Sequence, residues 1–186
     1  MKINVVGMDP SIRNWGYAMA VLDTETLEIA VQSLDLSVTA KESAKAADGF
    51  RRSRLHMARM RKNTADASIC FAELPTGSQS ASAAKAIGVC VGIMAAVEIP
   101  LICVSPNDVK IATVGKRTAT KSQMINWGLR RHPEASWMMR KSKGTLVPVA
   151  ANEHLADAIG AIYAGLLTDE FTAAVAMFNS LKAETE

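Results

Sequence analysis

The sequence predicts an α/β fold in which one five-stranded mixed sheet is flanked by helices. Two observations lead to this prediction. Three apolar runs follow one another near the N-terminus, at residues 2–9, 15–23 and 27–36, and the polar turn at residues 24–26 joins the last two. Farther along, short apolar runs alternate with segments of helical periodicity. The first three strands are therefore expected to form an antiparallel meander, and the later alternation places helices on the faces of the sheet.

The middle of the chain supplies two helices and the last two strands. Residues 41–65 carry Ala, Leu and Met at helical spacing among many arginines, which indicates a basic helix. Residues 68–74 form the fourth predicted strand, and a helix of about residues 79–98 follows it. The apolar run at residues 100–104 is typical of a buried fifth strand.

The C-terminal third is expected to be mostly helical. A polar segment rich in lysine follows Pro106 and leads into a helix over about residues 120–131. Residues 134–149 look like a loop with a basic core. Asn152 is expected to cap a long helix, and a further helix covers about residues 169–183.

Length and composition indicate one globular domain spanning residues 1–186. The chain is 49% hydrophobic and 21% charged, which is typical of a globular protein, and no apolar run reaches the ~18 residues that a membrane span requires. Asp9 interrupts the N-terminal apolar stretch where a signal peptide would keep its core. An intracellular, cytoplasmic location in a bacterial or phage-infected cell is the resulting expectation.

Cysteine usage and net charge exclude some functions and leave others open. Cys70, Cys90 and Cys103 are odd in number and lack metal-type spacing, so they are interpreted as reduced core residues, without disulfides or zinc. The net charge of +3 does not by itself indicate a polyanionic partner. Nucleic-acid binding depends instead on how the basic residues cluster.

A stripe of small residues marks the helix predicted over residues 79–98. Small side chains recur every four positions, at Ala84, Gly88, Gly92 and Ala96. Such a stripe allows another helix or the sheet to approach closely. Packing within one chain is the preferred interpretation, and a dimer interface is the alternative.

Acidic residues end two of the predicted strands. Asp9 follows the apolar run VVGM, and Glu73 follows SICFA. A lone Asp-Pro more often begins a turn than binds a ligand. Two carboxylates at the ends of two apolar strands are costly unless they are paired, and metal coordination is a common remedy.

The last long helix offers two more candidate ligands. His154 and Asp157 lie three residues apart, so a helix places them on one face, although an ordinary surface pair would have the same spacing. Glu153 is an alternative to His154. Mostly oxygen ligands with one nitrogen suit Mg²⁺ or Mn²⁺, and two such ions about 4 Å apart would catalyse phosphodiester hydrolysis.

Four motifs, in order from Met1 to about Gly165, resemble those of the RuvC-type Holliday junction resolvases of the RNase H-like superfamily. They are GMDPSIRNWGYA, FAELP, SPNDVKIATVGKRTATKSQM and EHLADAIGAIYAG. Each motif alone is weak, but four in the same order are specific. The resemblance implies an RNase H-like fold and a homodimeric, metal-dependent endonuclease that makes paired nicks in four-way or other branched DNA.

The resemblance also implies roles for individual residues. Asp9, Glu73, His154 and Asp157 would be metal ligands. Lys121 would stabilise the transition state, and a cation aimed at developing phosphoryl charge is a strong catalytic device. Lys110 would contact the phosphates of the scissile strand. Further basic residues that cluster along the chain are expected to bind DNA: Arg51, Arg52, Lys116, Arg117, Arg140, Lys141 and Lys143.

The chain departs from the family in two places, which favours a phage or mobile-element branch. Cellular members carry an aromatic wedge shortly after the second acid, whereas no aromatic residue follows Phe71 before Trp127. The segment 134–149 is longer than its counterpart, and its Trp137 is interpreted either as stacking on bases or as packing on the core.

Three alternatives to a junction resolvase remain. An RNase H-like nuclease acting on RNA–DNA hybrids would share the fold. A sugar-kinase or actin-like ATPase would need two duplicated lobes, for which this chain has no room. A branched-DNA binding protein without activity would not need a complete set of four candidate ligands.

Overall fold

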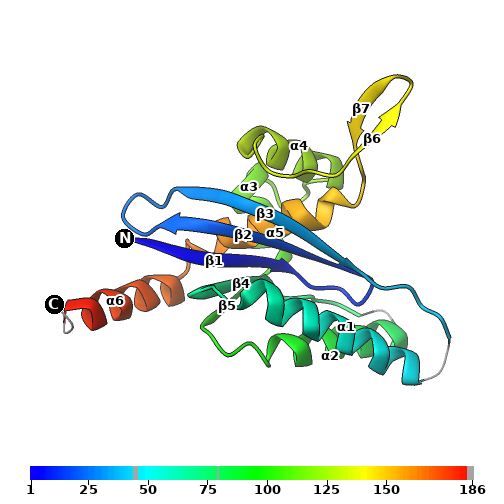
Figure 1. Cartoon of the computed structure of the whole chain (residues 1–186), viewed down its shortest axis with the longest axis horizontal. Coiled ribbons are helices and arrows are strands. Elements are labelled where there is room, and N and C mark those ends of the chain that lie inside the picture. Colours follow the sequence, from blue (N-terminus) through cyan, green and yellow to red (C-terminus); the bar gives the residue numbers. More distant parts are fainter. Residues whose placement is uncertain (44–45, 79, 184–186) are drawn as a thin grey trace.

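The computed structural model describes residues 1–43, 46–78 and 80–183 and contains the predicted sheet (Figure 1). Its strands are β1 (Lys2–Asp9), β2 (Asn14–Asp23), β3 (Ile29–Val38), β4 (Ile69–Glu73) and β5 (Leu101–Val104). They are ordered β3-β2-β1-β4-β5, with β1, β2 and β3 antiparallel in sequence and β4 and β5 parallel to β1. The mixed sheet and its opening meander are confirmed.

Helices cover both faces of this sheet. They are α1 (Ala46–Thr64), α2 (Ala81–Met94), α3 (Pro106–Val114), α4 (Lys121–Arg131), α5 (Asn152–Gly165) and α6 (Asp169–Ala183). One buried cluster joins the sheet to α1 and α2, and a second joins its other face to α3, α4 and α5. Helix α6 continues beyond α5 toward the C-terminus (Figure 1).

Strand alternation explains how the sheet is buried on both faces. Successive side chains of a strand point to opposite faces. In β1, Val5 packs with the α5 cluster and Val6 with the α1–α2 cluster; in β4, Phe71 and Cys70 divide in the same way. Helix α5 is the central helix of its layer, because ten of its residues are buried and it contacts β1, β2 and β4.

Several element boundaries differ from the prediction. Helix α1 begins at Ala46 rather than at residue 41, and α2 covers Ala81–Met94 rather than residues 79–98. The polar segment after Ser105 is in fact the helix α3, which begins with a Ser105–Asp108 capping box. Because Val109 is its only buried residue, this helix lacks the apolar periodicity by which helices are recognised in a sequence.

The segment 134–149 was expected to be a loop, but it contains a β-hairpin. Strands β6 (Met139–Ser142) and β7 (Thr145–Pro148) pair antiparallel. Lys143 and Gly144 form its two-residue turn. Their φ angles of 47° and 83° are both positive, as a type I′ turn requires. The predicted capping role of Asn152 is also wrong: Ala151 is the N-cap, without a side-chain hydrogen bond, and Asn152 is buried.

Two expectations about the core need correction. Cys70 and Cys90 are buried as predicted, but Cys103 is exposed, because it lies on the edge strand β5. Of the predicted stripe of small residues, Ala96 packs against the α1–α2 cluster, but Ala84, Gly88 and Gly92 are exposed on α2. Gly88 and Gly92 are exposed, and a Cβ atom at either would meet nothing within 4 Å.

Among the described residues, no single helix is long and apolar enough to cross a membrane. Only α5 and the first part of α6, taken together as a pair bent by 73°, reach the required length and composition.

Candidate active site

Two carboxylates lie side by side where β1 and β4 end. These strands are parallel neighbours, and their last paired residues are Met8 and Ala72, directly before Asp9 and Glu73. Met8 and Ala72 belong to the α1–α2 cluster. Alternation therefore turns the next side chains, Asp9 and Glu73, toward the opposite face, where α5 lies, on strands about 4.8 Å apart.

Two glycines let the backbone of α5 approach these strand ends. A Cβ atom on Gly16, which pairs with Asp9, would lie 2.1 Å from the carbonyl oxygen of His154. A Cβ atom on Gly7 would lie 1.9 Å from the carbonyl oxygen of Ala158. Real side chains do not tolerate such distances, so only glycine permits this packing. It places the first two turns of α5 against Asp9.

His154 of α5 contacts the strand acid directly. Its Nδ1 lies 2.5 Å from Oδ2 of Asp9, and its Nε2 lies 3.2 Å from Nδ2 of Asn14. Burial lowers the pKa of His154, but the hydrogen bond to Asp9 and the charges of Glu153 and Asp157 outweigh burial, so the net shift is upward. As arranged, both ring nitrogens face protein partners, and His154 orients Asp9.

Glu73 and Asp157 are crowded acids in a place with little water. Burial first, and then the charge of Asp9, raises the pKa of Glu73 to about 7, while Lys110 opposes the shift. Burial, followed by the charges of Asp9 and Glu73, raises the pKa of Asp157 to about 8. Oδ1 of Asp157 is buried without a hydrogen-bond partner. An unpaired buried carboxylate oxygen is costly, so this group is suited to a cation.

Lysines border the acids on two sides. Nζ of Lys121, at the start of α4, lies 2.7 Å from Oε1 of Glu153, which is 15% exposed, whereas Lys121 itself is 80% exposed. This hydrogen bond, reinforced by the neighbouring acidic charges, raises the pKa of Lys121. Lys110 is half-buried on α3 and close enough to Glu73 to lower its pKa. Lys110, Lys121 and the predicted acids thus meet at the end of the sheet where β1 and β4 finish.

The side chains of Asp9, Glu73, His154 and Asp157 form the donor set that a metal ion would meet at this site. In the part of the chain that the structure describes, no three His, Cys, Asp or Glu side chains stand ready to hold a metal ion as they are placed. The chemistry of the donors nevertheless fits a divalent cation. Asp9, Glu73 and Asp157 supply hard oxygen atoms, and the orphaned Oδ1 of Asp157 lacks a counter-charge. His154 would need to leave Asp9 or Asn14 to join them.

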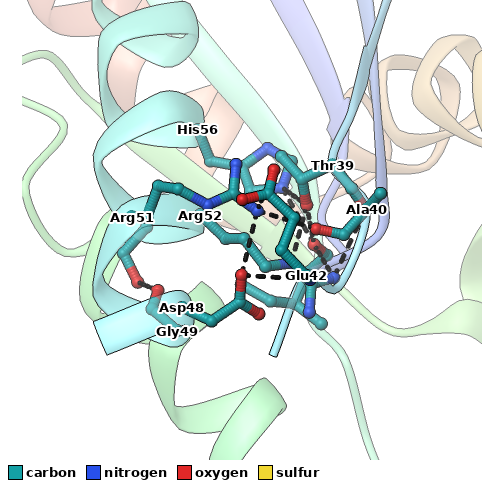
Figure 2. Close-up of polar contacts among 10 residues, drawn as sticks. Thr39, Ala40, Glu42, Asp48, Gly49, Arg51, Arg52 and His56 are labelled. Atoms are coloured by element: carbon teal, nitrogen blue, oxygen red, sulfur yellow. Dashed lines mark hydrogen bonds and ion pairs between the residues drawn. The ribbon is translucent and has the colours of Figure 1, made fainter. Parts of the chain in front are cut away.

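A clamp that the sequence did not reveal holds the turn between Asp9 and Asn14. The carbonyl oxygen of Ile12 accepts hydrogen bonds from Oγ1 of Thr39 (2.6 Å) and Nη2 of Arg52 (2.7 Å), and Nε2 of His56 lies 3.1 Å away. Figure 2 shows Arg52 and His56 of α1 meeting Thr39 at the end of β3. Burial lowers the pKa of His56, so this imidazole is neutral at neutral pH.

The clamp changes the interpretation of two predicted DNA contacts. Arg52 also donates from Nε to Thr39, and the neighbouring Arg51 binds Glu42 and Asp48 (Figure 2). Both guanidinium groups are thus used within the chain, so the structure gives Arg51 and Arg52 a structural role. For Arg52 no local pattern signals this role, because Ile12 and Thr39 are distant in sequence, whereas Arg51 and Asp48 lie three residues apart on α1.

Five other predicted DNA-binding residues lie exposed on the surface and form no ion pair with another described residue. Lys116 and Arg117 are exposed in the turn between α3 and α4, between Lys110 and Lys121. The cations of the hairpin are exposed as well: Arg140, Lys141 and Lys143.

Trp137 packs on the core, as one of its two interpretations predicted. Its Nε1 donates a hydrogen bond to the carbonyl oxygen of His132 (2.9 Å). A Cβ atom on Gly128 would lie 2.5 Å from the indole ring, so the ring lies directly on α4. These contacts hold the indole against α4 and fit the packing interpretation.

The strand order, the opening meander and the acids at the ends of β1 and β4 define an RNase H-like α/β fold. Within that class the chain has the fold of RuvC-type resolvases. It is similar to Thermus thermophilus RuvC in complex with Holliday junction substrate, with a TM-score of 0.61 and 17% identity over 87% of this chain and 92% of that one. A second Thermus thermophilus RuvC structure gives a TM-score of 0.58 and 20% identity over 88% and 92%.

More distant and sequence-based comparisons add little to this assignment. The Fowlpox virus resolvase in complex with Holliday junction DNA aligns over 96% of this chain and 99% of that one, at a TM-score of 0.47 and 16% identity. No protein-family model matches the sequence, and no curated protein matches it. At these identities the likeness to RuvC establishes the fold, and the function rests on the site.

Proposed function

We propose that this chain is a divalent-metal-dependent endonuclease that cleaves four-way DNA junctions by phosphodiester hydrolysis. One observation carries the proposal. Three carboxylates converge from two parallel strand ends and α5; the pKa values of Glu73 and Asp157 are raised, and one buried oxygen of Asp157 lacks a partner. Such crowding costs folding free energy, and a bound cation would remove the cost. The RuvC-type fold and the junction-bound state of one structural relative support the choice of substrate.

The residues divide the chemistry among themselves. Asp9, Glu73 and Asp157 would hold one or two Mg²⁺ or Mn²⁺ ions, with His154 as a further ligand. Bound there, these ions supply Lewis acidity to the scissile phosphate and lower the pKa of the attacking water. Until then His154 keeps Asp9 oriented through its Nδ1 contact, and Asn14 holds the other ring nitrogen.

Lys121 is placed to act on the phosphate itself. It is largely exposed, yet Glu153 holds its ammonium group at the rim of the site. When a phosphate arrives, Lys121 can exchange its contact with Glu153 for the phosphate oxygens. Stabilisation of developing charge by such a cation commonly accounts for about 10²–10³ in rate. Lys110, on the Glu73 side, is placed to contact the neighbouring phosphates.

The exposed stripe on α2 supports a homodimer. Ala84, Gly88 and Gly92 line an open helix surface, and Val91 of the same helix is 40% exposed. Small residues permit close helix contact, and exposed apolar side chains favour burial. A two-fold dimer would carry two sites, which matches the two nicks needed to resolve a junction.

The test is cleavage of an end-labelled mobile four-way junction with Mg²⁺ or Mn²⁺. The wild type is compared with Asp9→Asn and with Asp66→Asn, an exposed acid that precedes β4 at the other end of the sheet. Linear duplex and an RNA–DNA hybrid are parallel substrates, and binding is followed by fluorescence anisotropy. We expect paired nicks in the junction by the wild type and Asp66→Asn and none by Asp9→Asn.

Other outcomes would contradict the proposal in different ways. Equal cutting by the wild type and Asp9→Asn would refute the site. Preferential cutting of the hybrid would refute the substrate. Tight junction binding without cutting in Mn²⁺ would indicate a binding protein without activity.

A further inference from the structure

The β6–β7 hairpin (Met139–Pro148) stands clear of the body of the molecule (Figure 1). Its strands pair only with each other, and most of its residues are exposed. It carries three cations and no acid. A two-stranded hairpin is at best marginally stable alone, so one that projects this far needs a firm anchor or a partner.

The anchor connects the hairpin to the active site. Asn152 is fully buried and makes two hydrogen bonds to the backbone of Met138. Its Oδ1 accepts from the backbone nitrogen of Met138 at 3.1 Å, and its Nδ2 donates to the carbonyl oxygen of Met138 at 2.9 Å. The backbone nitrogen of Val149 donates to the same carbonyl at 3.0 Å. Because Asn152 is the first residue of α5, directly before Glu153 and His154, the hairpin is fixed relative to the first turn of the site helix.

The hairpin combines exposed apolar side chains with cations. Cross-strand pairing places Met139 beside Pro148 and Lys141 beside Leu146, and alternation puts all four on one face. Met139 is 43% exposed and Leu146 is 60% exposed, although both are apolar. Two-stranded ribbons of this kind fit DNA grooves, and exposed apolar side chains among cations are typical of wedges that unstack base steps.

The reach of the hairpin limits where it can act. Four residues at about 3.3 Å each place the turn roughly 13 Å beyond the anchor at Asn152. One DNA strand advances about 3.4 Å per nucleotide, so the hairpin covers about four nucleotides beside a phosphate held at α5. In a four-way junction, the bases most easily unstacked lie at the branch point.

We propose that the hairpin is the wedge with which this chain opens the branch point of its DNA substrate. Leu146 and Met139 lie against bases freed from their stack, while Arg140, Lys141 and Lys143 contact the flanking phosphates. The inference rests on the proposed junction cleavage. The chain has no aromatic residue between Phe71 and Trp127 that could open the strands from the Glu73 side. The proposal therefore assigns strand opening to the hairpin, which lies beside α5.

The test uses a four-way junction with 2-aminopurine at the branch point or ten nucleotides away, in Ca²⁺ to suppress cleavage. Wild type is expected to raise the fluorescence at the branch point only. Leu146→Ser is expected to bind within about two-fold of wild type, to lose the rise, and to cleave at least about ten-fold more slowly in Mg²⁺ or Mn²⁺. A junction with unpaired bases beside the branch point restores its cleavage.

Two variants accompany this measurement. Leu167→Ser, at a leucine 76% exposed beyond the far end of α5, is the matched control and is expected to behave as wild type. The combined variant Arg140→Gln, Lys141→Gln, Lys143→Gln is expected to bind at least about ten-fold more weakly and to lower the salt slope of binding by about 2.7, at about 0.9 per phosphate contact.

The results separate the two proposals. If wild type cuts junctions and Leu146→Ser opens and cuts them equally well, the wedge is refuted and the proposed function stands. If Leu146→Ser or the charge variant is monomeric in sedimentation while the wild type is a dimer, the hairpin is a protein interface and the wedge is refuted. If the wild type cuts no junction in either metal, the proposed function has failed, and the wedge with it.

Discussion

Replacement of Glu73 by glutamine is expected to stabilise the metal-free protein while abolishing cleavage. Burial, with the charge of Asp9, raises the pKa of Glu73 from an ordinary 4.5 to about 7. The folded state therefore binds the proton more tightly than the unfolded state does. The stability that Glu73 contributes is present in full below pH 4.5 and is lost as the pH rises through about 7.

The size of the effect follows from this shift. A free-energy difference of about 1.4 kcal/mol accompanies each pH unit between the unfolded and the folded pKa. At pH 9 the ionised Glu73 costs the fold about 3 kcal/mol. At pH 5.5 Glu73 is neutral in the fold and ionised in the unfolded chain, so the proton that it takes up on folding costs about 1 kcal/mol. Glutamine keeps the shape and removes the charge. Because the charge of Glu73 also raises the pKa of Asp157, the gain at pH 9 includes relief of that second acid.

The assay is thermal unfolding in EDTA at pH 9 and pH 5.5. A gain of about 3 kcal/mol raises the midpoint by roughly 6–12 °C in a chain of this size, and the gain at pH 5.5 should be about a third of that. Glu98→Gln, at an exposed glutamate, is the matched control and should change neither midpoint appreciably. A destabilised Glu73→Gln at pH 9, or a gain independent of pH, would refute the crowding of acids on which the metal site rests.

Three further predictions follow from other parts of the site. Gly16→Ala forces a Cβ atom to 2.1 Å from the backbone of α5, so it should destabilise the protein by at least about 1–3 kcal/mol in urea unfolding and abolish cleavage. The control is Gly49→Ala in α1, where a Cβ atom meets nothing, and this change should stabilise the protein by about 0.5–1 kcal/mol. No loss of stability in Gly16→Ala would contradict the close packing of α5 on β2. Arg52→Met removes hydrogen bonds to Ile12 and is expected to cost about 1–3 kcal/mol, with a lower kcat but unchanged DNA affinity at low salt; weaker binding instead would show a direct DNA contact. Lys121→Ala should lower kcat by about 10²–10³ with the affinity nearly unchanged, and a change confined to affinity would argue against its role at the transition state.

The sequence alone determined the sheet and the two strand acids. Apolar runs and helical periodicity are local signals, so the meander, β4, β5 and α5 were predicted within a few residues. Asp9 and Glu73 were recognised because a charge at the end of an apolar strand conflicts with its surroundings, and this conflict is visible without coordinates. The helix α3 escaped prediction because it buries almost nothing.

Only the tertiary structure decided how these residues act together. The contact of His154 with Asp9 spans 145 residues, and the clamp on Ile12 joins β3 and α1; neither leaves a local pattern. Burial of Asn152 and exposure of the α2 stripe depend on what packs against them, which periodicity does not specify. The raised pKa values of Glu73 and Asp157 arise in the same way, because they come from charges and burial brought together by the close approach of α5 at Gly7 and Gly16.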